Sequence, residues 1–230
     1  MNTAQNKIVL TEHLTTKLHN YRFEMLLAAL LLLLFDKIFV ADNDFFTRYV
    51  WPFNMIVLGL ASVGIFKERN IWVRWLKNIL FVISVLVPLL FGRIVQIPVL
   101  TEAIFLTFTA YYALILVEVL RQIFQKSETT LSVVFGSVCG FLLLIVVALF
   151  IFLFLEYNTP GSFNGITGDS IPQIYNQLTY FSMVTLATVG YGDITPATET
   201  ARLTTMFFAI SGQFYMVALV GIIISRFTSK

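Results

Sequence analysis

The sequence predicts an all-α membrane protein with six transmembrane helices and one short re-entrant helix. Apolar residues make up 58% of the 230-residue chain and charged residues only 12%, with a mean hydropathy of +0.84. This balance excludes an ordinary soluble domain. A helix crosses the bilayer with roughly 20 apolar residues, and runs of about this length occur at residues 23–40, 50–66, 78–93, 97–120, 131–155 and 199–225.

A seventh apolar stretch, residues 171–187, predicts a helix that enters the membrane without crossing it. Polar residues interrupt this stretch, and glycines follow it at once. Pro172 suits the first turn of such a helix, because the N–H donor that proline lacks would have no helical partner there. The polar segment 156–170 that precedes it then lies outside the membrane.

The distribution of Lys and Arg sets the predicted orientation, because these residues gather on the cytoplasmic side of membrane proteins. With the amino terminus inside, only Lys37, Arg48, Arg93 and Arg202 fall outside. The inside segments then hold the other basic residues, namely Lys7, Lys17, Arg22, Lys67, Arg69, Arg74, Lys77, Arg121, Lys126, Arg226 and Lys230. We predict a multi-pass protein of the plasma membrane with both termini cytoplasmic.

Small residues in the fifth run predict close helix packing. Gly136 and Gly140 are four residues apart, a spacing that lets a neighbouring helix approach closely. The sole cysteine, Cys139, lies between them and is expected to be a packing residue, since it has no partner for an intrachain disulfide.

The most specific motif is Thr-Leu-Ala-Thr-Val-Gly-Tyr-Gly-Asp at residues 185–193. Consecutive backbone carbonyls can replace the hydration shell of a potassium ion if they all face one way. Glycines permit the backbone angles that this requires, and a helix ending nearby directs its negative dipole end toward the cation. We expect Tyr191 to point away from the ion and pack against this helix, and the Thr188 hydroxyl to lie below the carbonyls. The predicted potassium ligands are Thr188, Val189, Gly190, Tyr191 and Gly192.

This motif resembles the selectivity filter of the potassium-channel pore-domain family. The family pattern Thr-x-x-Thr-x-Gly-Tyr-Gly-Asp begins here at Thr185 and ends at Asp193. The resemblance covers roughly residues 131–227 and includes Arg202 and Gly212, which match the family's outer arginine and hinge glycine. It implies a homotetramer, because one filter segment cannot surround an ion.

The resemblance also divides the chain into four parts. Residues 1–22 form a cytoplasmic amino-terminal segment, and residues 23–120 a peripheral bundle of four transmembrane helices. Residues 121–130 form a cytoplasmic linker. Residues 131–230 form the pore domain, with its outer helix, pore helix, filter and inner helix. We expect no cytoplasmic nucleotide- or calcium-binding domain after the last span.

One position departs from the family pattern. Some members carry a glutamate four residues before the filter threonine, paired with the filter aspartate, whereas this chain has Val184 there. We predict that Tyr180, in the pore helix, is the partner of Asp193 instead. The alternative is a solvated Asp193 with no partner.

The last helix is expected to line the pore below the filter. Counting from Gly212, the pore-facing positions of the family fall on Gln213, Met216, Val220 and Ile224, whose spacing puts them on one helical face. The three apolar residues could close the pore by dewetting, with bends at Gly212 or Gly221. The alternative is that this face packs between subunits and that gating occurs at the filter.

The fourth predicted span lacks the repeated basic residues of a voltage sensor. Residues 97–120 contain no Lys or Arg, and their charged residues are Glu102 and Glu118. We therefore predict that opening depends little on voltage. At the span ends we expect ion pairs, Arg93 with Asp36 or Glu102, and Glu118 with Arg121 at a three-residue spacing.

Other functions fit the sequence less well. A non-selective cation channel or a non-conducting regulatory subunit remains an alternative, whereas a potassium transporter subunit would need four divergent filter loops in one chain. An enzyme is not expected, because no nucleophile–base pair or metal-ligand cluster emerges, and His13 and His19 lie in the tail. We predict no cofactor beyond the permeant potassium ions. The expected partners are further copies of the chain and the lipid bilayer, not nucleic acid.

Overall fold

The structure is a computed structural model that describes residues 21–40, 42, 45–63, 65, 75, 78–83, 86–87, 98–125, 131–168 and 170–228. Its longer elements are the helices α2 (Arg22–Phe35), α4 (Trp51–Val63), α6 (Pro98–Gln125), α7 (Leu131–Asn158), α8 (Ile171–Leu186) and α9 (Glu199–Thr228). A 3-10 turn, η1 (Asp36–Ile38), follows α2, and a short π-helix, η2 (Phe46–Val50), leads into α4. Strand β1 (Phe163–Asn164) pairs antiparallel with β2 (Thr195–Pro196).

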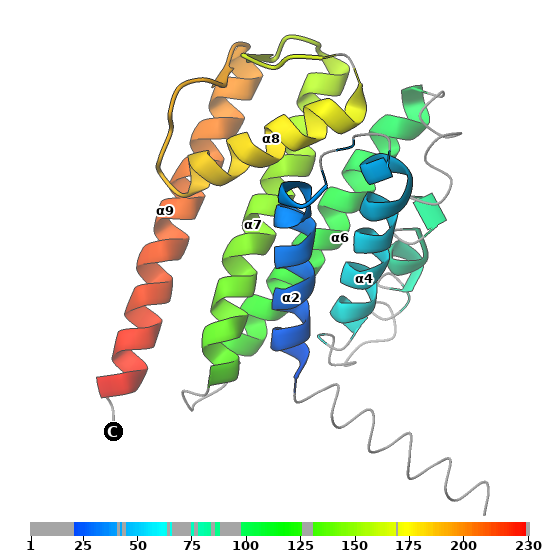
Figure 1. The fold of residues 1–230 in the computed structure, drawn as a ribbon. Coiled ribbons are helices and arrows are strands. Elements are labelled where there is room, and N and C mark those ends of the chain that lie inside the picture. Colours follow the sequence, from blue (N-terminus) through cyan, green and yellow to red (C-terminus); the bar gives the residue numbers. More distant parts are fainter. Residues whose placement is uncertain are drawn as a thin grey trace, which may run out of the picture.

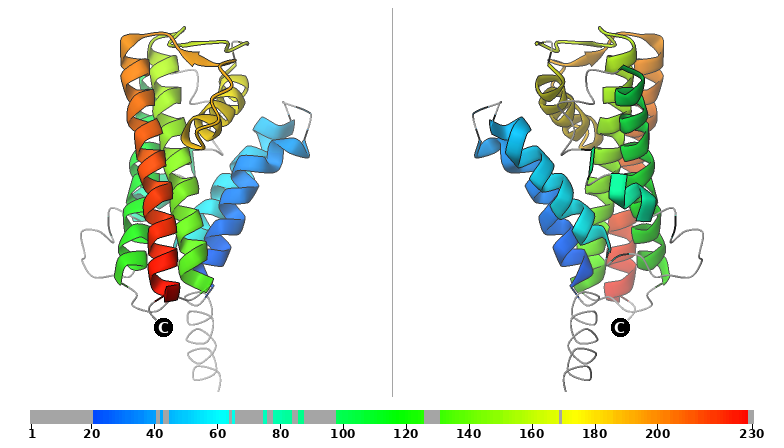
Figure 2. Two further views of the ribbon diagram at one scale, coloured as in Figure 1. Left: turned by 90° about the vertical axis from the view of Figure 1, so that its left-hand side faces the viewer. Right: turned by 90° about the vertical axis from the view of Figure 1, so that its right-hand side faces the viewer.

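Helix α7 lies at the centre of the described elements and packs against α2, α6, α8 and α9 (Figure 1). It is apolar on every side, as expected of a helix surrounded by others. The short helix α8 lies across one end of the bundle, between α7 and α9, and the strands lie just beyond it (Figures 1 and 2). In Figure 2, α2 and α4 lean away from the upright helices α7 and α9.

Two described helices, α6 and α7, are long and apolar enough to cross a membrane, over Val99–Gln125 and Leu131–Asn158. Helices α2 and α4 have 14 and 13 residues, fewer than the roughly 20 that a crossing helix needs. Half of the predicted third span, residues 78–93, falls outside the described residues. Residues 1–20 and 126–130 of the predicted cytoplasmic segments also lie outside them. The helical character is confirmed, and the two long apolar helices fit a membrane protein. The six spans stay a prediction.

The glycine pair of α7 makes room for two different neighbours. A Cβ on Gly136 would lie 3.2 Å from the ring of Phe23 in α2, and a Cβ on Gly140 would lie 2.1 Å from the hydroxyl of Tyr215 in α9. That hydroxyl donates a hydrogen bond to the carbonyl of Ser137, at 2.7 Å. The predicted close packing is confirmed, with one glycine serving each side of α7.

An aromatic cluster connects the peripheral helices to α8. The rings of Trp51 in α4 and Tyr175 in α8 meet edge to face, with centroids 6.2 Å apart. Phe150 of α7 lies between Phe108 of α6, at 5.1 Å, and Tyr175, at 6.4 Å. Such ring pairs add about 0.5–1.5 kcal/mol each beyond the area that they bury. The first half of α8 therefore rests on peripheral helices of its own chain.

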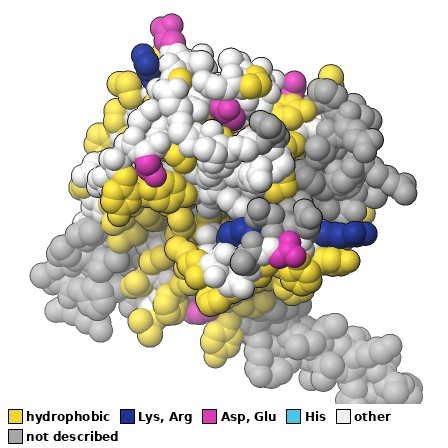
Figure 3. Space-filling view, turned by 45° about the horizontal axis from the view of Figure 1, so that its top comes forward, with side chains coloured by type: hydrophobic (Ala, Val, Ile, Leu, Met, Phe, Trp, Pro, Cys, Tyr) yellow, Lys and Arg dark blue, Asp and Glu magenta, His cyan; other side chains and the backbone are white. Residues whose placement is uncertain are grey.

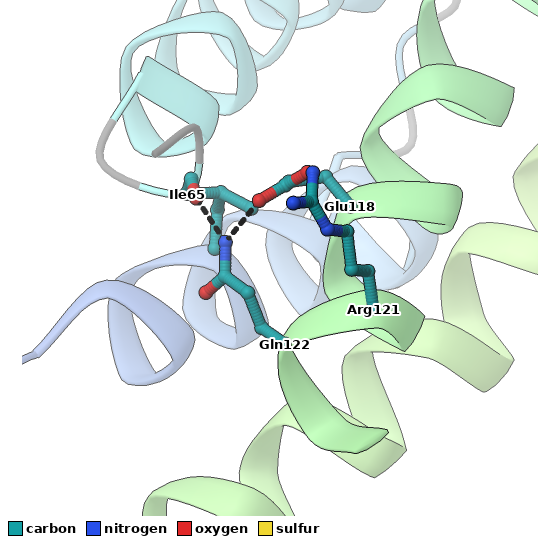
Figure 4. A network of polar contacts seen from close by, with 4 residues as sticks. All are labelled: Ile65, Glu118, Arg121 and Gln122. Carbon is teal, nitrogen blue, oxygen red and sulfur yellow. Dashed lines mark hydrogen bonds and ion pairs between the residues drawn. The ribbon is translucent and has the colours of Figure 1, made fainter. Parts of the chain in front are cut away.

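Polar contacts join α6 to the end of α4 (Figure 4). The predicted ion pair between Arg121 and Glu118 is confirmed, with 3.6 Å between nitrogen and oxygen. Gln122, which the sequence did not single out, donates to Glu118 at 2.9 Å and to the carbonyl of Ile65. Arg93 lies outside the described residues. Asp36, one of its two expected partners beside Glu102, is buried and accepts a hydrogen bond from Asn54.

Candidate functional site

The chain leaves α8 at Leu186 and turns back along the end of that helix. The N–H groups of Val189 and Gly190 both donate to the carbonyl of Val184, at 2.8 and 3.2 Å, and the N–H of Thr188 donates to the carbonyl of Thr185 at 3.1 Å. The last carbonyls of α8 have no partner within the helix. They accept hydrogen bonds from the first N–H groups of the loop and so fix its position.

The backbone of this loop alternates in handedness. Thr188, Gly190 and Gly192 have positive φ values of 61°, 54° and 84°, whereas Val189 and Tyr191 do not. Alternation of this kind turns successive N–H groups to one side of the chain and the carbonyls to the other. Within the described part of the chain, no hydrogen bond reaches the carbonyl oxygens of residues 188–191. The loop therefore presents a row of free carbonyls, an arrangement suited to a cation.

Thr188 is the residue whose backbone the sequence analysis did not anticipate. Positive φ is rare for a β-branched residue, and a strained conformation of this kind costs about 1–3 kcal/mol. Gly is the residue expected at a position with positive φ, so the neighbouring sequence does not predict this conformation for a Thr. The hydrogen bond from the Thr188 N–H to the Thr185 carbonyl holds the conformation.

The loop is open to one side in a single chain. Residues 187–193 are all exposed, and 72% of the surface of Tyr191 is accessible. The expected packing of Tyr191 against α8 stays a prediction. Figure 3 shows polar side chains and backbone over much of the end of the molecule that carries this loop, with several acidic side chains among them.

Asp193 and Tyr180 are brought together at the end of the loop. The Tyr180 hydroxyl donates to the Asp193 carboxylate and, with backbone donors at Asp193 and Ile194, holds the pKa of that carboxyl below its usual value of 3.8. Both side chains are accessible to solvent. Val184, in the position where some family members have glutamate, contributes its backbone carbonyl to the loop instead of a side-chain partner.

Glu156 supports the outer side of this site and was missed in the sequence. It lies in the last turn of α7 and is buried, and its carboxylate accepts hydrogen bonds from the N–H groups of Gly161, at 2.9 Å, and Phe163, at 3.0 Å. The segment that Glu156 holds includes β1, which pairs with β2. Strand β2 follows closely after residues 187–193, which we call the filter loop. A negative carboxylate near the carboxyl terminus of a helix is unfavourable, because that end of the helix carries a partial negative charge. The position of Glu156 in the sequence could therefore have indicated that hydrogen-bond donors surround its carboxylate.

Comparison with known proteins identifies the region that carries the loop. Residues 141–229 match the family described as ion channel. The voltage-gated potassium channel Kch of Escherichia coli is 33% identical over 161 residues, which cover 68% of this chain and 33% of that protein. The two-pore potassium channel 4 of Arabidopsis thaliana is 29% identical over 105 residues, 46% of this chain and 37% of the relative. These matches support a potassium-channel pore-domain family for the part of the chain that carries the loop.

Two further comparisons complete this result. The two pore potassium channel c of Oryza sativa is 47% identical over 53 residues, 23% of this chain and 11% of that protein. The matched parts span about a third of the length of the first two relatives, 37% and 33%. No solved structure gives a significant match.

The helix that the sequence predicts as the inner helix of the pore is α9. Gly212 lies against the end of α8, and Gln213 and Met216 are exposed in a single chain. The helix continues without interruption past Gly212 and Gly221. The side chains of Val220 and Ile224 lie outside the described residues, so the predicted row of pore-facing side chains is described only in its upper half. Arg202, the outer arginine, donates from Nε to the carbonyl of Pro196 at 3.2 Å and so ties α9 to β2.

Proposed function

We propose that four copies of this chain assemble into a potassium-selective channel, with the filter loops lining the central axis. The observation that carries the proposal is the alternating handedness of residues 188–192, which leaves consecutive carbonyls free while the first N–H groups of the loop are held by α8. A ring of such carbonyls from four chains can replace the hydration shell of potassium.

The exposed surfaces of a single chain support assembly around an axis. The filter loop has one open side. One face of α9 carries large apolar side chains, each more than half exposed, at spacings of three, four or seven residues: Leu203, Met206, Phe207, Ile210 and Val217. In a membrane protein, an apolar face of this kind packs against lipid or against another helix. Because this face of α9 lies beside the filter loop, we propose that it packs against other copies of the chain.

We further propose that opening depends only weakly on voltage. Helix α6, which precedes the pore domain, has its only basic residue, Arg121, in its last turns, where it pairs with Glu118. A charge crossing the membrane contributes only about 2.3 kcal/mol per 100 mV, so a sensor needs several of them. The E. coli relative is named as voltage-gated. We do not extend that property to this chain, because α6 lacks the repeated basic residues of a voltage sensor.

The proposal is tested by ion flux from purified protein in liposomes. Potassium should pass far better than sodium, and barium should block, because it has the size of potassium with twice the charge. Gly190→Ala should abolish conduction or selectivity, since alanine resists the positive φ at that position. Equal passage of sodium and potassium would instead indicate a non-selective channel, and no flux of either ion would indicate a non-conducting subunit.

Voltage dependence is tested on the same protein in planar bilayers. We expect open probability to change gradually over the accessible voltage range, with any residual dependence following the permeant ion. A steep, saturating activation curve that is unchanged when the permeant ion is replaced would contradict the proposal. Antibody or protease access to the two termini in sealed cells tests the expected cytoplasmic location of both.

A further inference from the structure

We propose that a groove between α6 and α9 binds the acyl chain of a bilayer lipid and thereby braces the inner helix. The groove has a volume of about 340 Å³ and is formed by three helices. Its α6 wall carries Leu116, Leu120 and Phe124, Leu144 of α7 lies in its floor, and its α9 wall carries Phe214 and Ala218. This volume is in the range of about 300–1,000 Å³ that is typical of small-molecule sites.

The length of the groove suits a hydrocarbon chain. The residues that line it on α6 span one continuous row at four-residue intervals, which at about 1.5 Å per residue is about 12 Å along the helix. The lining of α9 runs from Ser211 to Leu219 and covers the same distance. The groove is therefore elongated along the direction in which an acyl chain lies in a bilayer.

The polar groups in the groove are already satisfied within the protein. The Ser137 hydroxyl donates to the carbonyl of Val133 at 2.9 Å, and the Ser211 hydroxyl donates to the carbonyl of Phe207 at 2.7 Å. The Tyr215 hydroxyl donates to the carbonyl of Ser137. An occupant would therefore meet an essentially apolar wall with no hydrogen bond to offer, which favours hydrocarbon over water or a polar ligand.

The position of the groove favours lipid over another copy of the chain. At about 3.6 residues per turn, Ser211 and Ala218 lie on the opposite side of α9 from Gln213 and Met216, the predicted pore-facing residues. The groove thus lies behind α9, away from the pore. Its other two walls are α6 and α7, the helices that are long and apolar enough to cross the membrane. Figure 2 shows the part of α9 toward its carboxyl terminus, drawn in red, beside α6 and α7.

An occupied groove would hold the lower half of α9 against α6. Ser211 and Tyr215 flank Gly212 and Gln213 along the helix, so a chain seated beside them contacts the segment that adjoins the filter and the predicted pore lining. Emptying the groove would leave the walls without packing partners, and the helix would then move more freely relative to α6. Lipid occupancy is in this way a control on α9.

Photolabelling tests the binding step without requiring ion conduction. The full-length protein is placed in nanodiscs of phosphatidylcholine with a diazirine on one acyl chain, and labelled residues are found by mass spectrometry. We expect adducts on groove residues, including Phe124 and Ala218. The variant Ala218→Phe should lose the groove adducts by filling the space. The control Val117→Phe, on an exposed part of α6 outside the groove, should keep them.

Two results would overturn the proposal. Adducts confined to the outward face of α6, unchanged by Ala218→Phe, would show that the groove holds no lipid. Labelling of the groove in dissociated monomers but not in the assembled protein would show that another copy of the chain fills it. If the parent conducts, Ala218→Phe should change the rate of potassium flux with selectivity intact, and unchanged flux would refute the bracing role. Loss of conduction in the parent would refute the proposed channel but leave the labelling result valid.

Discussion

Gly212 of α9 lies directly against Leu186, the last residue of α8. A Cβ on Gly212 would come within 2.9 Å of the Leu186 carbonyl oxygen and 3.2 Å of its Cα. Because Leu186 leads straight into the filter loop, this contact joins the inner helix to the filter through backbone atoms. Close approach explains the glycine here, and its role as a hinge stays a prediction.

Gly212→Ala should therefore destabilise the protein. Alanine is the better helix former by about 1 kcal/mol, but overpacking against backbone atoms costs typically about 1–3 kcal/mol. Gly221→Ala is the matched control, because its added methyl group would meet no atom of another element within 4 Å. Thermal unfolding of both purified variants should show a lower midpoint for the first and an equal or higher one for the second. Equal shifts in the two would show that close approach is not what position 212 requires.

The contact between Gly140 and Tyr215 predicts a rescue. Gly140→Ala would force its methyl group into the Tyr215 hydroxyl and should destabilise the packing of α7 on α9. Tyr215→Phe alone loses one hydrogen bond, worth about 0.5–1.5 kcal/mol. Combined with Gly140→Ala, Tyr215→Phe removes the atom with which the new methyl group would clash. The double variant should therefore lose less unfolding free energy than the sum of the losses in the two single variants. Strict additivity of the three unfolding free energies would contradict this account.

Tyr180→Phe should change the acid sensitivity of the filter region. The Tyr180 hydroxyl lowers the pKa of Asp193 below 3.8, so the stability that this bond contributes is present above that value and is lost as pH falls through the lowered pKa. Without the hydroxyl, the pKa returns toward its usual value, and acid inactivation should begin at a higher pH. Potassium flux measured against external pH tests this, with Tyr175→Phe in the same helix as control. Coincident profiles for Tyr180→Phe and the parent would show that the bond does not control Asp193.

Polar substitutions on α9 locate a gate, if the inner helix holds one. Met216→Asn, Val220→Asn and Ile224→Asn each place a polar ring at one level, and a ring that stays wet should raise resting potassium flux at the level of the gate. Exposed Val117, on α6 and away from the pore-facing row of α9, provides the control Val117→Asn. If none of the three conducts more than the parent, and cysteine probes below the filter react equally in resting and active states, gating occurs elsewhere.

Elements with a strong local pattern could be predicted from the sequence. The short helix predicted at residues 171–187 is observed as Ile171–Leu186, because Pro172 marks its start and the glycine-rich loop its end. Glu118 and Arg121 pair as expected, because their spacing alone places them on one helical face. The last helix begins at Glu199, the first residue of the predicted span.

Features that depend on contacts between distant segments could not be predicted in this way. The positive φ of Thr188 is held by the end of α8, and Thr has no intrinsic preference for it. The role of Glu156 depends on a loop that folds back over it. Gln122 reaches the carbonyl of Ile65, 57 residues away in the sequence. In each case the local residue type is compatible with an ordinary surface or helix position, and the tertiary partner determines the outcome.

The reversal potential of the purified protein tests the central claim most directly. The protein is reconstituted into planar bilayers with potassium on one side and sodium on the other, and the zero-current voltage is read. A filter of free carbonyls at residues 188–191 predicts a large zero-current voltage, with the potassium side negative, that reports a high ratio of potassium to sodium permeability and is lost in Tyr191→Asp. A value near zero under opposing, equal concentrations of the two ions would contradict the account.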